Sequence, residues 1–126
     1  MACAGTVLVV DDDPILREIV SELLQQHGYE VWLAEDGAIA LDRLARELPD
    51  LVVMDMVMPN TDGVEAIHSV KKTWPNLPVI AVSAGAGRLD PSVLLRAATT
   101  LGADASMTKP LRPVEFVALV ASLMPA

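Results

Sequence analysis

The chain has 126 residues, a formal net charge of −8, 52% hydrophobic residues and a single cysteine. This length is typical of one domain, so we expect a single domain over residues 1–126, with an ordered core from about 6 to about 124. The acidic balance argues against direct binding to nucleic acid or to anionic membranes, which depends on clustered Lys and Arg. No apolar run approaches the roughly 18 residues of a membrane span, and no cleavable leader pattern is present, so we expect a cytoplasmic protein.

Short apolar runs alternate with amphipathic segments, which is typical of a parallel sheet wrapped by helices. Thr6–Val10 is continuously apolar and predicts a strand that is buried on both faces. Asp13 and Pro14 predict the cap and first turn of a helix that ends at His27-Gly28. Its inner face is expected to hold Ile15, Leu16, Ile19, Val20, Leu23 and Leu24.

The middle of the chain repeats this strand and helix pattern twice. Glu30–Ala34 predicts a strand, and Asp36-Gly37 opens a helix that Pro49 ends. The apolar face of that helix is expected to hold Leu41, Leu44 and Leu48. Leu51–Met54 predicts the third strand. The helix that follows is expected to begin at Asp62, with Glu65 completing a capping box, and to bury Val64, Ile67 and Val70 before Trp74-Pro75.

The last third of the chain predicts two further strands and two helices. Pro78–Val82 is the expected fourth strand, and a helix should run from Asp90-Pro91 to about Leu101-Gly102. A brief strand at about Ala105–Met107 follows. Pro113 begins the final helix, whose expected inner stripe is Val114, Val117, Val120 and Met124.

Polar side chains stand at the predicted ends of four strands. Asp11 and Asp12 follow the first strand, Asp55 the third, Ser83 the fourth and Lys109 the fifth. Because ligands bind at the carboxyl ends of the strands in open parallel sheets, we expect these groups to meet at one edge. Three close carboxylates repel one another, so an empty pocket either protonates one of them or recruits a cation, and Mg²⁺ prefers such oxygen ligands. Asp55 could then attack phosphorus while Lys109 offsets charge on the phosphoryl oxygens.

The sequence resembles the receiver domain of two-component response regulators from near its N-terminus to the last helix. The matching segments are VLVVDDDP, DMVMPNTDG, AVSA and GADASMTKPL, in this order and spacing. The resemblance implies an α/β, doubly wound, five-stranded parallel sheet of order 2-1-3-4-5 with five helices. It also implies that the protein is a phosphoacceptor switch in a phosphorelay and not a turnover enzyme.

The resemblance also assigns site residues. It makes Asp55 the phosphoacceptor and gives Mg²⁺ the ligands Asp12, Asp11 (partly through water), Asp55 and the backbone carbonyl of Val57. Ser83 becomes the switch hydroxyl and Lys109 the phosphate-contacting lysine, with a cis peptide before Pro110. These implied roles all fall on positions that match the family motifs.

Partners follow from the same resemblance. It implies a sensor histidine kinase or a histidine phosphotransfer protein as donor, and a downstream protein effector or a fused output domain as receiver of the signal. The face formed by the fourth helix, fifth strand and fifth helix is expected to carry that signal. Whether phosphorylation also produces a homodimer through this face stays open at the level of sequence.

The chain departs from the family pattern at three places. Ser106 stands where the family usually has Tyr or Phe as the second switch residue, and the segment between Ser83 and Gly102 is longer than usual. Val57 has no polar group to position an attacking water, so we expect slow loss of phosphate. A phosphoryl half-life unchanged by Val57→Asn would contradict that expectation.

Three other functions are alternatives to that of a receiver domain. A phosphohydrolase that forms an aspartyl phosphate commonly needs a carboxylate two residues after the nucleophile, where this chain has Val57. A flavin mononucleotide module needs a hydroxyl- and glycine-rich loop after the first strand, whereas this chain has the acidic run Asp11–Asp13. A receiver-like interaction module that never needs phosphate stays open, because of Ser106 and the altered fourth-helix region.

Overall fold

The strands form one parallel sheet in the order β2-β1-β3-β4-β5, as the resemblance implies. The structure is a computed structural model that describes residues 4–56, 63–83, 96, 99–100 and 102–124. The strands are β1 (Thr6–Val10), β2 (Glu30–Ala34), β3 (Leu51–Asp55), β4 (Val79–Ser83) and β5 (Ala105–Thr108). Each lies within about one residue of its predicted position.

The described residues contain four helices of more than one turn. They are α1 (Pro14–Gln26), α2 (Gly37–Arg46), α3 (Gly63–Thr73) and α5 (Pro113–Leu123). The helix predicted from Asp90-Pro91 to about Leu101-Gly102 falls largely outside the described residues, although Arg96, Thr99 and Thr100 are helical. The predicted capping residue Asp62 also lies outside the described residues. No helix of the described part of the chain is long and apolar enough to cross a membrane.

Asp side chains begin the first two helices, as predicted. The Asp13 carboxylate accepts a hydrogen bond from the backbone N–H of Ile15 at 2.9 Å, which caps α1. The Asp36 carboxylate accepts one from the N–H of Ile39 at 2.8 Å, which caps α2. Such caps satisfy backbone donors that have no partner within the helix. The first helix begins four residues after the end of β1, and the second begins three residues after the end of β2.

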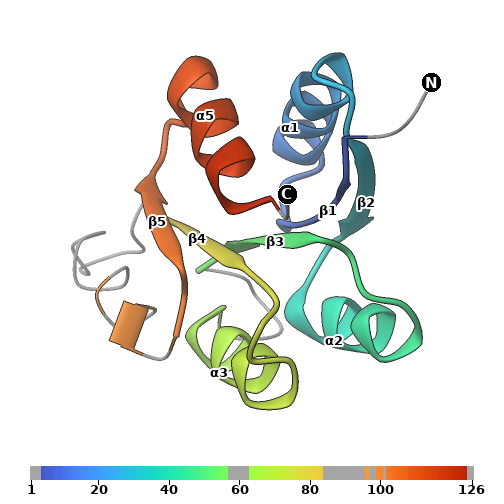
Figure 1. The fold of residues 1–126 in the computed structure, drawn as a ribbon, viewed down its shortest axis with the longest axis vertical. Helices are drawn as coiled ribbons and strands as arrows, with labels where there is room; N and C mark the ends of the chain where they lie inside the picture. Colours follow the sequence, from blue (N-terminus) through green and yellow to red (C-terminus); the bar gives the residue numbers. More distant parts are fainter. Residues whose placement is uncertain (1–3, 57–62, 84–95, 97–98, 101, 125–126) are drawn as a thin grey trace.

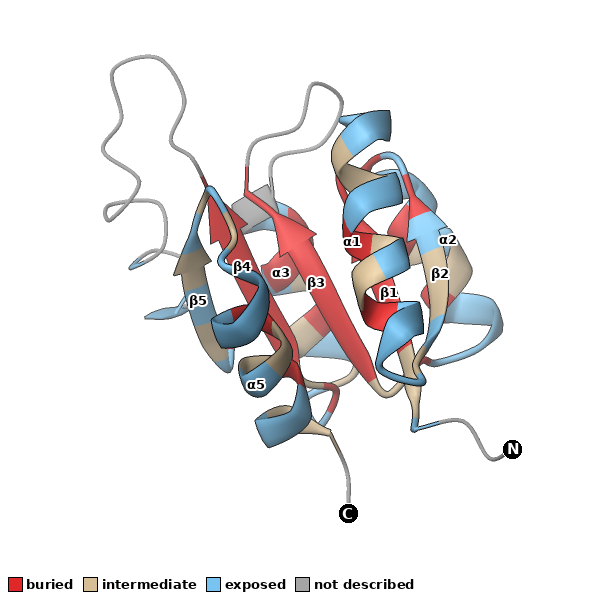
Figure 2. Cartoon of the chain, turned by 90° about the horizontal axis from the view of Figure 1, so that it is seen from above, coloured by how far each residue is buried: buried red, intermediate tan, exposed pale blue. Residues whose placement is uncertain are grey.

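Helices cover both faces of the sheet. The helices α1 and α5 lie on one face, and α2 and α3 lie on the other (Figure 1). The central strands β1, β3 and β4 are the most buried (Figure 2). Their side chains alternate between the two faces, as the geometry of a strand requires. The sheet is therefore the middle layer of three.

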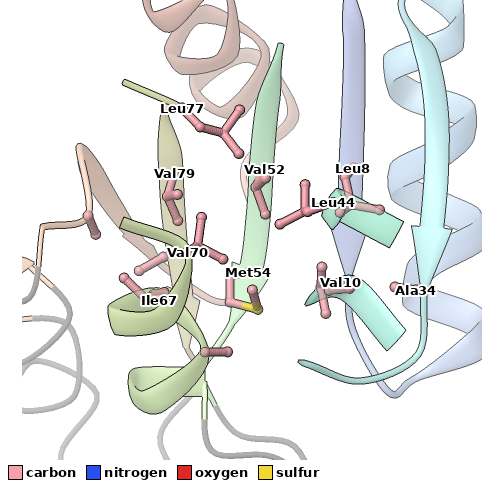
Figure 3. Close-up of a cluster of buried hydrophobic side chains, with 14 of the residues drawn as sticks. Leu8, Val10, Ala34, Leu44, Val52, Met54, Ile67, Val70, Leu77 and Val79 are labelled. Atoms are coloured by element: carbon pink, nitrogen blue, oxygen red, sulfur yellow. The ribbon is translucent and has the colours of Figure 1, made fainter. Parts of the chain in front are cut away.

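Two hydrophobic cores lie on the two faces of this sheet. The first gathers Leu8, Val10, Leu44, Val52, Met54, Ile67, Val70 and Val79 between the sheet and the helices α2 and α3 (Figure 3). The second gathers Val7, Val9, Val20, Leu24, Val53, Ile80, Phe116 and Val120 against α1 and α5. The predicted inner residues Ile67 and Val70 of α3 are fully buried. The structure does not describe the side chain of Val64, the third predicted inner residue. Trp32 and Trp74 pack against the first core.

The predicted inner face of α1 was too wide. Ile15 and Ile19 are 69% and 56% exposed, whereas Val20 and Leu24 are buried. Successive residues of an α-helix are rotated by about 100°, and a helix on a sheet buries a stripe of about that width. Ile15 and Ile19 each precede the buried stripe by one residue, so they point away from the sheet.

Two other predicted apolar faces also need correction. Val114 is 84% exposed, because Phe116 and Val120, four residues apart, occupy the buried stripe of α5. The helix α2 ends at Arg46, before Leu48, and Leu48 is 48% exposed. Sequence periodicity therefore located the four helices of the described residues, but it extended α2 too far and assigned too many side chains to the buried faces.

Candidate functional site

The sheet brings the ends of four strands to one edge. Asp11 directly follows β1, Asp55 ends β3, Ser83 ends β4 and Lys109 directly follows β5. The register pairs Asp55 with Val82 and Ser83 with Thr108, so the strands end nearly level with one another. Polar residues that are far apart in the sequence therefore share one edge, as predicted.

Three carboxylates meet at this edge. One carboxylate oxygen from each of Asp11, Asp12 and Asp55 lies within 4.8 Å of the other two. Asp11 and Asp55 are buried, with 6% and 5% of their surface exposed, while Asp12 is exposed. Buried carboxylates at this distance repel one another unless a cation lies between them.

Lys109 supplies part of that positive charge. Its Nζ atom lies 3.0 Å from Oδ2 of Asp11 and 3.3 Å from Oδ2 of Asp55. Burial alone would lower the pKa of Lys109, but the hydrogen bond to Asp11 and the charges of Asp55 and Asp11 outweigh burial, so the pKa is raised. Lys109 is therefore a permanent cation beside the two buried carboxylates at physiological pH.

Asp11 is held through four of its atoms. Its carboxylate Oδ1 accepts a hydrogen bond from the N–H of Asp13 at 2.9 Å, and its Oδ2 accepts from Lys109. Its N–H donates to the carbonyl of Ala34 at 3.1 Å, and its own carbonyl accepts from Nη1 of Arg17 at 2.7 Å. The acidic loop after β1 is therefore tied to β2, α1 and the β5–α5 connection.

Sequence reasoning did not identify Arg17 as part of this site. A signal was available, because Arg17 is the first Lys or Arg of the chain and the next is Arg43. A lone cation one turn into the helix that follows an acidic run is placed to reach back to that run. The contact was missed because its acceptor is a backbone carbonyl, which a residue pattern does not reveal.

The remaining predicted site residues differ in how far the structure describes them. Ser83 is fully buried at the end of β4, and its carbonyl accepts a hydrogen bond from the N–H of Lys109 at 3.0 Å. The peptide between Lys109 and Pro110 is cis, as predicted. Ser106 is exposed on β5, paired with Ala81 of β4. Val57 lies outside the described residues.

The donor set fits Mg²⁺. All three candidate side chains offer oxygen atoms, which this ion prefers, and the exposed position of Asp12 leaves room for the waters that it usually keeps. Within the described part of the chain, no hydrogen bond engages the carboxylate of Asp12. That carboxylate is therefore available to a metal ion without breaking an existing contact.

Most of the chain matches the model of one protein family. The family model described as "Response regulator receiver domain" matches residues 7–121 of the chain. The chain belongs to the response regulator receiver domain family. The role of this family is phosphorelay signalling in two-component systems, in which the receiver domain is a phosphoacceptor switch.

Curated relatives of this receiver domain are bacterial regulators. It is 36% identical over 119 residues to the probable transcriptional regulatory protein TcrX of Mycobacterium tuberculosis, covering 94% of the chain and 49% of TcrX. It is 39% identical over 119 residues to the response regulator MprA of Mycobacterium sp. strain KMS, covering 94% of the chain and 50% of MprA. The receiver domain thus spans about half the length of the curated relatives that it matches.

Solved structures of similar proteins share the fold of this receiver domain. The chemotaxis protein CheY4 of Vibrio cholerae superposes with a TM-score of 0.85 at 27% identity, covering 98% of the chain and 100% of CheY4. A putative response regulator of Chloroflexus aurantiacus superposes with a TM-score of 0.85 at 31% identity, covering 94% and 96% of the two chains. The fold of this chain is therefore that of a receiver domain.

Proposed function

We propose that Asp55 accepts a phosphoryl group from a phosphohistidine of a sensor kinase or phosphotransfer protein, in a reaction that depends on Mg²⁺. The observation that carries the proposal is the position of the Asp55 carboxylate. It is buried, it lies 3.3 Å from the Lys109 ammonium, and it shares a cluster with the carboxylates of Asp11 and Asp12. The domain then works as a switch whose state is set by this modification.

The transfer is a displacement at phosphorus. A carboxylate oxygen of Asp55 forms the new P–O bond while the P–N bond of the phosphohistidine breaks. The imidazole leaves with the electron pair of that bond and takes a proton from solvent. An electron pair of the Asp55 carboxylate is now in the P–O bond, and the phosphoryl group brings its own negative charge into a pocket that already contains the carboxylates of Asp11 and Asp12.

Residues of this chain offset that charge. Bound Mg²⁺ would supply a Lewis acid for the phosphoryl oxygens. The proposed ligands are Asp12 directly, Asp11 partly through water, Asp55, and the backbone carbonyl of Val57. Lys109 is already within ion-pair distance of Asp55, so only a small movement of its ammonium group would bring it to a phosphoryl oxygen.

Ser83 and Lys109 are the proposed sensors of the phosphoryl group. Hydrogen bonds to charged groups contribute about 1.5–3 kcal/mol each, so two such bonds supply a few kcal/mol. Moving a two-state equilibrium from 1:99 to 99:1 takes about 5.5 kcal/mol. We therefore propose that phosphorylation shifts the population partly and that a bound partner completes the change.

An apolar hollow beside Lys109 is the proposed docking surface for the phosphodonor. It is lined by Leu16, Ile19, Val20, Leu23, Lys109, Pro110, Leu111 and Pro113, between α1 and the start of α5, with a volume of about 420 Å³. The exposed side chains Ile15, Ile19 and Val114 lie on the same two helices. Exposed apolar surface of this kind marks interaction sites. A donor helix seated there would approach Asp55 from the side of Lys109.

A second surface of the domain is the proposed binding site for an output partner. The expected output face consists of the fourth-helix region, β5 and α5, and most of the first of these lies outside the described residues. Ser106 and Thr108 expose hydroxyl groups on β5, where the family usually presents an aromatic ring at position 106. We propose a cytoplasmic partner or a fused output domain at this face, with homodimerisation on phosphorylation.

Intact mass after incubation with Mg²⁺ and a small acyl phosphate tests the proposed reaction. A stable phosphoryl-sized mass gain that is absent in Asp55→Asn supports the switch. Continuous hydrolysis of phosphate esters would support a hydrolase instead. No mass gain with any donor would leave a receiver-like interaction module that works without phosphate.

A further inference from the structure

Arg17 contacts the backbone of the acidic loop after β1 and not its carboxylates. Its Nη1 atom donates a hydrogen bond of 2.7 Å to the backbone carbonyl of Asp11. The side chain is half-buried on α1, beside Leu33, Glu35 and Ile39. Its backbone N–H donates to the carbonyl of Asp13 at 3.0 Å, so the residue is anchored in the first turn of the helix.

This hydrogen bond holds the carbonyl of the peptide between Asp11 and Asp12, while the hydrogen bond from the Asp13 N–H to the Asp11 carboxylate holds the next peptide. The Asp11 carbonyl belongs to that peptide, and a peptide unit is planar. Holding the carbonyl therefore also sets the direction in which the Asp12 Cα atom leaves the peptide. Because the carboxylate of Asp12 is attached at this atom, its position depends on the peptide plane.

The position of the Asp12 carboxylate depends more on the backbone than the position of the Asp11 carboxylate does. Asp11 has its two carboxylate oxygens held by the N–H of Asp13 and by Lys109. Asp12 is exposed, and among residues that the structure describes none forms a hydrogen bond with its carboxylate. The contribution of Asp12 to the cluster of three carboxylates thus depends on the backbone that Arg17 holds.

We propose that Arg17 is a positioning residue for the metal site. It holds the Asp11–Asp12 peptide so that the carboxylate of Asp12 faces the proposed Mg²⁺ position, and it does not contact the ion. This inference rests on the proposed function, because it presupposes that the acidic cluster binds Mg²⁺. It adds a residue to the site whose role depends on a backbone contact.

Removing the Arg17 side chain should change the Mg²⁺ affinity in opposite directions for a role in charge alone and for a positioning role. A guanidinium close to the acidic cluster repels a divalent cation, so its loss alone would strengthen Mg²⁺ binding. Loss of a positioning contact instead weakens binding, and removal of residues that orient metal ligands typically costs about 10–100-fold in affinity. The sign of the change therefore separates a positioning role from a role in charge alone.

The test measures the Mg²⁺ dissociation constant by following the backbone amide resonances of Asp11 and Asp12 during titration with MgCl₂. We expect Arg17→Met to weaken binding about 10-fold or more. Arg17→Lys should lie between Arg17→Met and the wild type, because an ammonium group can donate to the same carbonyl but lacks the planar fork. Arg46→Met is the matched control, since it removes the same charge from an exposed position on α2 and should leave the affinity unchanged.

The outcomes separate this inference from the proposed function. A wild-type protein that binds no Mg²⁺ would overturn the proposed metal site and this inference with it. Wild-type binding with equal or tighter binding by Arg17→Met, at an unchanged thermal unfolding midpoint without metal, would overturn the positioning role alone. If Arg17→Met does not fold, Arg17→Gln, whose shorter uncharged side chain does not reach the Asp11 carbonyl, takes its place, and affinity equal to or above that of the wild type in that variant would overturn the inference.

Discussion

The ammonium group of Lys109 lies 3.3 Å from the carboxylate of Asp55, although 54 residues separate them in the chain. The same ammonium lies 3.0 Å from the carboxylate of Asp11. One cation thus bridges two buried anions at the carboxyl edge of the sheet. This arrangement gives Lys109 two roles, since it stabilises the pocket and competes with a metal ion for the same oxygens.

Replacing Lys109 by Met should therefore change two measurements in opposite directions. Mg²⁺ should bind more tightly, because the carboxylates lose a competing cation, while phosphoryl acceptance from a small acyl phosphate should slow by about 10-fold or more. Titration with MgCl₂ and the time course of the mass gain provide the two values. Weaker Mg²⁺ binding in Lys109→Met would contradict this account of the pocket.

Mg²⁺ should stabilise the folded protein through the acidic cluster. At a free concentration of about 100 times the dissociation constant, a ligand that binds only the folded state adds about 2.7 kcal/mol to the free energy of unfolding. Urea unfolding with and without MgCl₂ measures this gain. Asp12→Asn should lose most of it, whereas Glu47→Gln, which changes an exposed charge after α2, should keep it. An equal gain in both variants would place the ion elsewhere.

The raised pKa of Lys109 predicts a pH range for its contribution to stability. Burial opposes the charged form, but the hydrogen bond to Asp11 and the charges of Asp55 and Asp11 prevail, so the folded-state pKa is above the unfolded-state value. The resulting stabilisation is complete below the unfolded pKa of about 10.4 and is lost as pH rises through the folded pKa. The difference in unfolding free energy between the wild type and Lys109→Met, without metal, should therefore stay constant from pH 7 to about 9.5. A steady decline over that range would mean that Lys109 loses its proton earlier.

The hollow beside Lys109 gives a prediction about the donor. Ile19→Ser changes an exposed side chain that lines the hollow, so it should slow phosphoryl transfer from a histidine-containing donor protein by about 10-fold. It should leave acceptance from a small acyl phosphate unchanged, because the acceptor pocket is not altered. Leu48→Ser, at a similarly exposed apolar residue after α2, is the control and should affect neither rate. Equal slowing by both variants, or by Ile19→Ser with both donors, would argue against this docking surface.

The sequence predicted the fold well because its signals were local and repeated. Five apolar runs, the caps Asp13 and Asp36, and the strand order implied by family resemblance all match the structure. The buried faces of α1 and α5 were predicted less well. Three apolar residues of these helices are exposed: Ile15, Ile19 and Val114. Helical spacing alone cannot distinguish an apolar residue that packs on the sheet from one that stays on the surface of the domain.

The candidate site was predictable where each residue ends a strand. Asp11, Asp12, Asp55 and Lys109 meet because parallel strands end at one edge, and this follows from the topology. Arg17 was missed because its contact is with a backbone carbonyl, whose direction depends on the folded loop. The roles of Val57 and of the segment before Gly102 stay predictions, because they fall largely outside the described residues.

The most direct test locates the phosphoryl group on the chain. After incubation with Mg²⁺ and an acyl phosphate, the protein is digested at low pH and the peptides are fragmented in a mass spectrometer. We predict a single modified residue, Asp55, and no modification when Mg²⁺ is removed by a chelator. A phosphoryl group on Asp11, Asp12 or a histidine, or an unmodified Asp55 under all conditions, would contradict the account.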